Sequence, residues 1–299
     1  MDIIHIIAII AFIFGFVVKK SKKCPAKLYL FVNQFIILFC LPSISLLKIP
    51  SLEFNGQMIH LVITAWLIFF AGIPFFYLLS KIFKWKKETL VCLIVVCGLG
   101  NTAFIGLPII GSLFGEEALT YAVFIDQPGS FLIISTVGTA LCIIAASGKI
   151  SIPQILFKLI TFPPFIAFLF AVFVPIHPSG YLKEIMLFLI KIIGPLALFS
   201  LGLQFSLNLK ETEWLPLTLG LIYRLLLGPF IVMIYLKLFY GKSDLINTVG
   251  IMENAMAPMM TAAIISAKYN LNPKLGNALV TIGVPISFLT ILLWKLILV

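Results

Sequence analysis

Long apolar runs follow one another along almost the whole chain, and they constrain its fold more than any other feature. Hydrophobic residues make up 62% of the 299 residues, and charged residues only 11%. A water-soluble domain of this size could not bury so much apolar surface, so the surrounding solvent is predicted to be lipid. The sequence therefore predicts an all-α integral membrane protein with short loops and no separate soluble domain.

Each membrane-spanning helix needs about 20 mostly apolar residues, and ten such runs fill the chain. The predicted spans are 3–18, 28–47, 58–80, 90–113, 120–146, 154–174, 182–203, 214–236, 245–267 and 275–298. Because Met1–Val18 has no basic leader and no small-residue cleavage site, we interpret it as a retained first helix.

The positive charge indicates how these helices are oriented. The net charge is +10, but the lysines form short clusters between apolar runs, so we expect no nucleic-acid partner. With the amino terminus outside, 14 basic residues lie in the predicted cytoplasmic segments and five on the opposite side. Basic residues concentrate in cytoplasmic loops, so the sequence predicts a multi-pass cell-membrane protein (plasma or inner membrane) with both termini outside.

Proline and asparagine recur at matching places in two halves of the chain, with spacings between 153 and 157 residues. The pairs are Pro42 with Pro195, Pro74 with Pro229, Asn101 with Asn254, and Pro128 with Pro285. We predict a first repeat at 1–146, a short cytoplasmic linker at 147–153 and a second repeat at 154–299. Since five helices are an odd number, the second repeat is inverted in the membrane. Inverted repeats are typical of secondary transporters.

The spans 90–113 and 245–267 carry glycine, asparagine and proline at mid-membrane depth. Proline removes a helical donor, and irregular backbone at that depth is tolerated only inside protein or beside a watery cavity. Two interrupted helices in matching positions indicate a transport site. The candidate binding residues are Gly100, Asn101, Thr102, Gly106, Pro108, Asn254, Ala255 and Pro258. The alternative is a simple proline kink with glycines for close helix packing.

The stretch Gly100-Asn101-Thr102-x-Phe104-x-Gly106-x-Pro108 resembles a signature of the auxin efflux carrier family, whose bacterial members include proteins described as malonate and malate permeases. The run Ala-Met-Ala-Pro at 255–258 resembles the matching region of the second repeat. The resemblance implies that the fourth and ninth spans cross at their breaks. It also implies a scaffold of the first, second, sixth and seventh spans, a mobile unit of the other six, and a small organic anion as substrate.

Asp126, Lys191, Arg224 and Glu253 fall in the interior of predicted spans, where a charge costs about 2.5–3.5 kcal/mol on insertion scales. Glu253 lies next to the second break, and we expect it to carry a coupling proton or help to hold a coupling cation. Asp126 is the next candidate, and Gln127 could share its site. Arg224 could form an ion pair with either acid or compensate a carboxylate substrate, and Lys191 is given no role.

The other residues indicate no cofactor. The five cysteines and three histidines show no metal-ligand spacing, so neither a metal nor a catalytic centre is predicted. The coupling ion, H⁺ or Na⁺, and a homodimer remain open. We predict a carrier of small carboxylates by elevator-like alternating access. The alternatives are a sodium-coupled symporter of the related bile-acid type, a channel and a membrane-embedded lipid-modifying enzyme.

Overall fold

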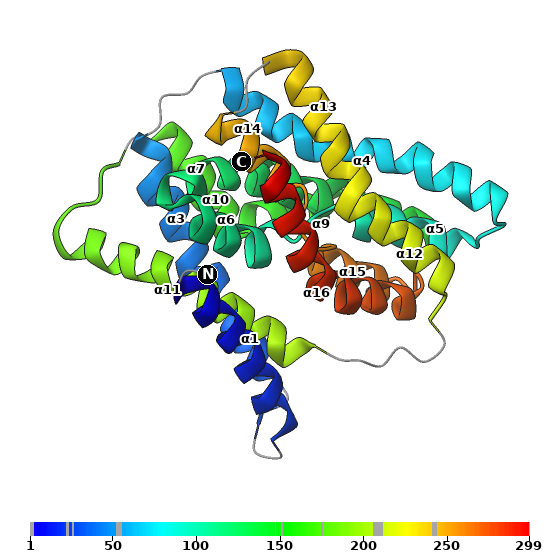
Figure 1. Cartoon of the computed structure of the whole chain (residues 1–299), viewed down its shortest axis with the longest axis horizontal. Coiled ribbons are helices and arrows are strands. Elements are labelled where there is room, and N and C mark those ends of the chain that lie inside the picture. Colours follow the sequence, from blue (N-terminus) through cyan, green and yellow to red (C-terminus); the bar gives the residue numbers. More distant parts are fainter. Residues whose placement is uncertain are drawn as a thin grey trace. The chain divides into compact units, whose positions relative to one another are not determined.

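The computed structural model is built of helices. It describes residues 3–21, 24–25, 27–51, 56–146, 148–150, 152–174, 176–205, 212–240 and 244–298. Within these residues there is no β-strand (Figure 1). In the same residues, a single isolated bridge joins Gly100 and Pro258.

The helical elements follow the predicted spans to within a few residues. The chain forms, in order, α1 (Ile3–Lys20), α2 (Leu28–Phe35), η1 (Ile36–Cys40), α3 (Leu41–Lys48), η2 (Ile49–Ser51), α4 (Gly56–Ile82), α5 (Lys87–Cys97), η3 (Thr102–Gly106), α6 (Leu107–Phe114), α7 (Glu116–Ile125), η4 (Asp126–Phe131), η5 (Ile134–Gly138), α8 (Thr139–Ala145), α9 (Ile152–Thr161), α10 (Pro163–Phe173), α11 (Gly180–Gln204), α12 (Trp214–Ile222), η6 (Tyr223–Leu227), α13 (Gly228–Tyr240), α14 (Leu245–Glu253), α15 (Met260–Lys268) and α16 (Pro273–Leu298).

Six continuous helical stretches in the described residues are long and apolar enough to cross a membrane. They are Leu28–Lys48, Met58–Ile82, Glu116–Ala145, Gly180–Gln204, Trp214–Tyr240 and Pro273–Leu298. A bent pair, Ile155–Thr161 with Pro163–Phe173, makes a seventh if it is one span. The predicted spans 90–113 and 245–267 are each divided into two shorter helices. The chain is thus a multi-pass helical protein, while ten crossings and the inverted repeat remain predictions.

Several helices widen where a proline interrupts their hydrogen bonds. The π-helical turns η1, η3 and η6 end just before Pro42, Pro108 and Pro229, and η4 contains Pro128. Proline has no N–H and clashes with the carbonyl one turn earlier, so a wider turn relieves the clash without ending the helix. These local distortions follow directly from the proline positions.

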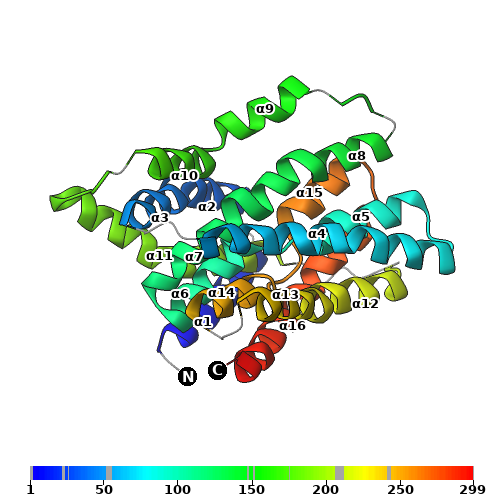
Figure 2. The same ribbon diagram turned by 90° about the horizontal axis from the view of Figure 1, so that it is seen from above.

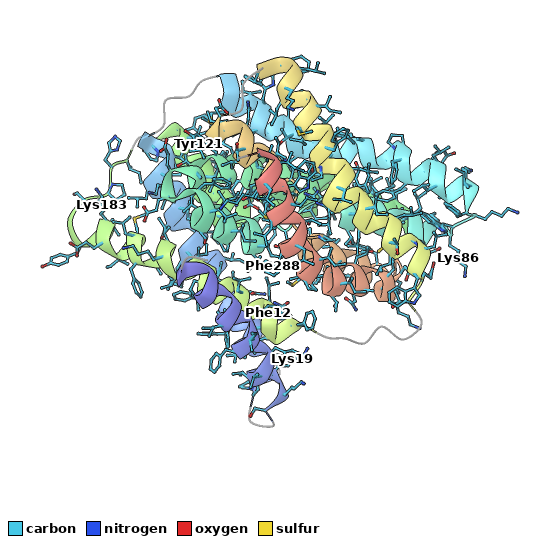
Figure 3. All side chains as sticks on the ribbon, viewed as in Figure 1. Phe12, Lys19, Lys86, Tyr121, Lys183 and Phe288 are labelled. Carbon is cyan, nitrogen blue, oxygen red and sulfur yellow. The ribbon has the colours of Figure 1, made fainter. Side chains whose placement is uncertain are left out.

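The helices form two compact units. Unit 1 comprises Met1–Phe54, Ala103–Val123 and Leu159–Ser206, and unit 2 comprises Asn55–Thr102, Phe124–Lys158 and Leu207–Val299. In unit 1, α1 packs along α11, as Figure 1 shows, and α3 packs against α10. The side chain of Lys19 (Figure 3) donates to the carbonyl of Phe205 at 2.6 Å and so caps the end of α11.

Two glycines bring α1 and α11 into close contact. A Cβ atom on Gly15 would clash with the carbonyl of Phe199, and one on Gly202 would clash with the carbonyl of Phe12. Each helix thus has a glycine where the backbone of the other helix approaches closely, as in close-packed membrane helices. Helices α1 and α11 are therefore in backbone-to-backbone contact within unit 1.

In unit 2, the buried helix α5 lies among α4, α12, α15 and α16 (Figure 2). Helix α4 also packs against α13 and α14, and α15 packs against α16. Most residues of α5 and α14 are buried, including the ends of both helices at Cys97 and Glu253. The core of unit 2 therefore surrounds the ends of two short helices.

Candidate functional site

The chain leaves the helical conformation between α5 and η3 (98–101, the first interruption) and between α14 and α15 (254–259, the second interruption). These two segments pair with each other. The backbone N–H of Asn101 donates to the carbonyl of Ala257 at 2.8 Å, and the N–H of Met259 donates to the carbonyl of Leu99 at 3.1 Å. These two hydrogen bonds form the antiparallel bridge between Gly100 and Pro258. Each interruption thus satisfies backbone groups of the other, which is how a membrane protein can leave its helical hydrogen bonds at depth.

Glycine at position 100 is required by the close approach of the two interruptions. A Cβ atom there would lie 2.6 Å from Nη2 of Arg224 and 3.4 Å from the carbonyl oxygen of Glu253. A larger side chain would displace the guanidinium from its position. Pro258, which cannot donate a backbone hydrogen bond, lies opposite this glycine.

Arg224 is almost fully buried and is bound to the backbone of the second interruption. Its Nε donates to the carbonyl of Met256 at 3.1 Å, and its Nη2 donates to the carbonyl of Asn254. Among the described residues, no carboxylate lies within the 4.0 Å of an ion pair with this guanidinium. The ion pair with Asp126 or Glu253 considered from the sequence is therefore not formed. The positive charge instead lies at the negative end of the α14 dipole.

Asn254 connects the second interruption to a third helix. Its Nδ2 donates to Oγ1 of Thr64 in α4 and to the carbonyl of Gly250, both at 2.8 Å. The Thr64 hydroxyl donates in turn to the carbonyl of Leu61. Sequence reasoning missed Thr64, although a threonine inside the apolar span 58–80 was a detectable signal.

Asp126 is buried and holds both oxygens in hydrogen bonds. Thr102, which follows the first interruption, donates from its hydroxyl to Oδ1 at 2.5 Å. Gln127 donates from Nε2 to Oδ2 at 2.5 Å. Gln127, which the sequence suggested could share a site with Asp126, is thus hydrogen-bonded to it, and so is Thr102.

Glu253, the last residue of α14, is completely buried. In the described part of the chain, neither of its carboxyl oxygens has a hydrogen-bond partner, and Oε1 of Gln127 has none either. The guanidinium of Arg224 is near the backbone of Glu253, since a Cβ atom on Gly100 would approach both Arg224 Nη2 and the carbonyl oxygen of Glu253. Buried acceptors without donors are uncommon in folded proteins and call for a chemical explanation.

The remaining predicted site residues do not all lie at the paired interruptions. Ala255 is buried within the second interruption. Gly106 and Pro108 belong to unit 1, where a Cβ on Gly194 of α11 would be 3.6 Å from Pro108. No cluster of three or more potential His, Cys, Asp or Glu metal ligands occurs among the residues that the structure describes.

Comparisons with known proteins identify the family of the chain. A family model described as membrane transport protein matches residues 1–295. An uncharacterized transporter of Methanocaldococcus jannaschii is 29% identical over 98% of this chain and 97% of its own length. Another, from Methanothermobacter thermautotrophicus, is 28% identical over 69% of this chain and 67% of its own. Family and relatives are transporters, not enzymes. The chain therefore belongs to the membrane transport protein family, the auxin efflux carrier family that its Gly-Asn-Thr motif predicted.

Proposed function

We propose that this transporter is a secondary active carrier that moves a small organic anion, such as a mono- or dicarboxylate, by alternating access. The observation that carries the proposal is the pairing of two helix interruptions through the Gly100–Pro258 bridge. Broken helices that meet inside a membrane protein provide fixed dipoles and free backbone groups where a substrate can bind.

The second interruption has carbonyl groups at the end of α14 and N–H groups at the start of α15. The start of α15 is therefore the end that favours an anion. Arg224 already binds the carbonyls of Asn254 and Met256. Helix α15 begins at Met260, and its N-cap residue, Met259, makes no side-chain capping bond. The first backbone N–H groups of α15 therefore provide donors and a partial positive charge, which a carboxylate can use.

The two units correspond in part to the scaffold and the mobile unit of an elevator. The predicted scaffold spans 3–18, 28–47 and 182–203 lie in unit 1, together with most of 154–174, but unit 1 also contains Ala103–Val123 from the predicted mobile spans. Both sides of the Gly100–Pro258 bridge lie in unit 2. A site within one compact unit can move as a rigid body, which is a recognised form of alternating access. We also propose the cell membrane as the location, with both termini outside.

Transport by purified protein in lipid vesicles tests the proposal. Vesicles loaded with unlabelled malonate or malate should take up the labelled compound by exchange. A sodium gradient and a pH gradient, applied separately, distinguish a sodium-coupled bile-acid-type symporter from a proton-coupled carrier. Failure of every tested carboxylate to exchange, or to raise the melting temperature of the purified protein, would contradict the anion proposal.

The Gly100→Ala variant tests whether transport depends on the paired interruptions. Overpacking of this kind costs about 1–3 kcal/mol, so we expect exchange to slow by about 5- to 150-fold if the barrier rises by that amount. Gly56→Ala is the matched control, because a Cβ at Gly56 has no atom within 4 Å. Normal exchange by a correctly folded Gly100→Ala variant would show that the interruptions are structural only.

A further inference from the structure

Only two carboxyl groups are buried in the described part of the chain, Asp126 and Glu253, and their surroundings differ. Both oxygens of Asp126 accept a hydrogen bond, one from Thr102 and one from Gln127. Neither oxygen of Glu253 accepts one. Two neighbouring acids in unequal environments commonly take different protonation states.

An ionised carboxylate is acceptor-only, and burying one without donors or a cation is costly. Asp126 has the donors that its ionised form requires. Glu253 has none, and the nearby guanidinium of Arg224 is directed to backbone carbonyls. The geometry therefore favours a neutral carboxylic acid at Glu253.

We infer that Glu253 binds one exchangeable proton, while Asp126 is held ionised by Thr102 and Gln127. With the proton bound, Glu253 carries no charge, and the buried charged side chains left among the described residues are Asp126 and Arg224. When Glu253 becomes accessible to water, its O–H bond breaks, the proton passes to water and a carboxylate remains. The use of this proton for coupling rests on the proposed carrier function, whereas the proton site itself does not.

Other charged groups lie farther toward the helix ends. Helix α14 packs against α4, α13 and α16, and carries Asp244 as its N-cap. The titratable side chains with charge on these elements are His60, Lys81, Lys237, Lys274 and Lys295, all at least partly exposed. Tyr223 and Cys97 are the further titratable neighbours of Arg224. Asp126 and Arg224 are therefore the buried charged side chains, besides Glu253, among the described residues.

A metal cation is the competing occupant of this site. The described residues contain no group of three potential His, Cys, Asp or Glu metal ligands. Both oxygens of Asp126 are already occupied by neutral donors. Among the described buried side chains, the acceptors without any hydrogen-bond partner are the two oxygens of Glu253 and Oε1 of Gln127. The contacts therefore favour a proton.

Infrared spectroscopy of the purified full chain tests the inference without a transport assay. A protonated carboxylic acid gives a C=O stretching band that an ionised carboxylate lacks. At neutral pH we expect such a band, shifted by ¹³C-labelled glutamate but not by ¹³C-labelled aspartate. It should be lost in Glu253→Gln, persist in Asp126→Asn and fall as the pH is raised.

The isotope experiment uses the unaltered protein, so it remains decisive even if a variant fails to fold. A band that follows labelled aspartate, or no carboxylic acid band at neutral pH, would overturn the assignment. Loss of the band on replacing potassium with sodium at constant pH would instead identify a sodium site. In vesicles, Glu253→Gln should lose accumulation driven by a pH gradient, and accumulation equal to the parent's would refute a coupling role.

Discussion

Arg224→Met removes the side chain that binds two buried carbonyls of the second interruption. The guanidinium donates through Nε to Met256 and through Nη2 to Asn254. A buried carbonyl left without a partner costs about 1–3 kcal/mol, so two carbonyls together give about 2–6 kcal/mol. Removing a buried charge partly offsets this loss, and we expect the free energy of unfolding to fall by about 2–4 kcal/mol.

Arg224→Lys separates the shape of the side chain from its charge. An ammonium group cannot reproduce the two-donor fork of a guanidinium, so we expect it to satisfy one carbonyl and to lose about half as much stability as Arg224→Met. Unfolding is measured in mixed detergent micelles by intrinsic fluorescence. Lys237→Met, which removes an exposed cation from α13, is the control and should unfold like the parent.

The opposite pattern would refute a backbone-binding role for Arg224. If Arg224→Met is as stable as the parent but no longer binds the carboxylate, whereas Arg224→Lys binds it normally, the arginine compensates the substrate charge. That result would restore the alternative considered from the sequence.

Two further predictions concern packing and orientation. Gly202→Ala should lower the free energy of unfolding by about 1–3 kcal/mol, because its Cβ meets the backbone of α1; equal stability of Gly202→Ala and Gly56→Ala in detergent would contradict this. In intact cells, an impermeant thiol reagent should label Lys183→Cys but not Lys86→Cys, both at exposed sites (Figure 3), in a Cys24→Ser background. The reverse labelling would invert the proposed topology.

Composition and proline placement predicted much of the helical architecture because lipid imposes strong local rules. Every crossing must be long and apolar, and every interruption needs a residue that permits it. The positions of Gly100 and Pro258 at mid-span therefore predicted where α5 and α14 end. The family motif, rather than periodicity, implied that the two interruptions meet.

The partners of the polar residues could not be predicted in the same way. Asn254 contacts Thr64, which is 190 positions away in the sequence. Arg224 binds backbone carbonyls, and because every residue has one, the sequence does not indicate which of them it binds. Charge alone suggested that Arg224 pairs with an acid, because sequence shows ionisable groups but not freed backbone groups. Pairing through the backbone becomes visible only when the fold places the end of α14 beside η6.

In the predicted repeat, the charged residues near the interruptions have uncharged residues at the matching positions of the other half. A shift of 155 residues, the spacing of Pro74 and Pro229, relates Arg224 to Phe69. Phe69 packs beside Gly98 at the first interruption, where a Cβ would be 3.0 Å from its ring. An aromatic ring thus lies at one interruption where a cation lies at the other.

The two buried acids, Glu253 and Asp126, also have uncharged residues at their matching positions. A shift of 153 residues relates Glu253 to Gly100, and a shift of 157 relates Asp126 to Gly283. Gly283 contacts the second interruption, since its Cβ would lie 2.6 Å from Pro258, just as Asp126 contacts the first through Thr102. At each of the three pairs, one half supplies a charge and the other an uncharged residue. If the two halves are inverted repeats as predicted, the inferred proton-binding group at Glu253 has no charged counterpart in the other half.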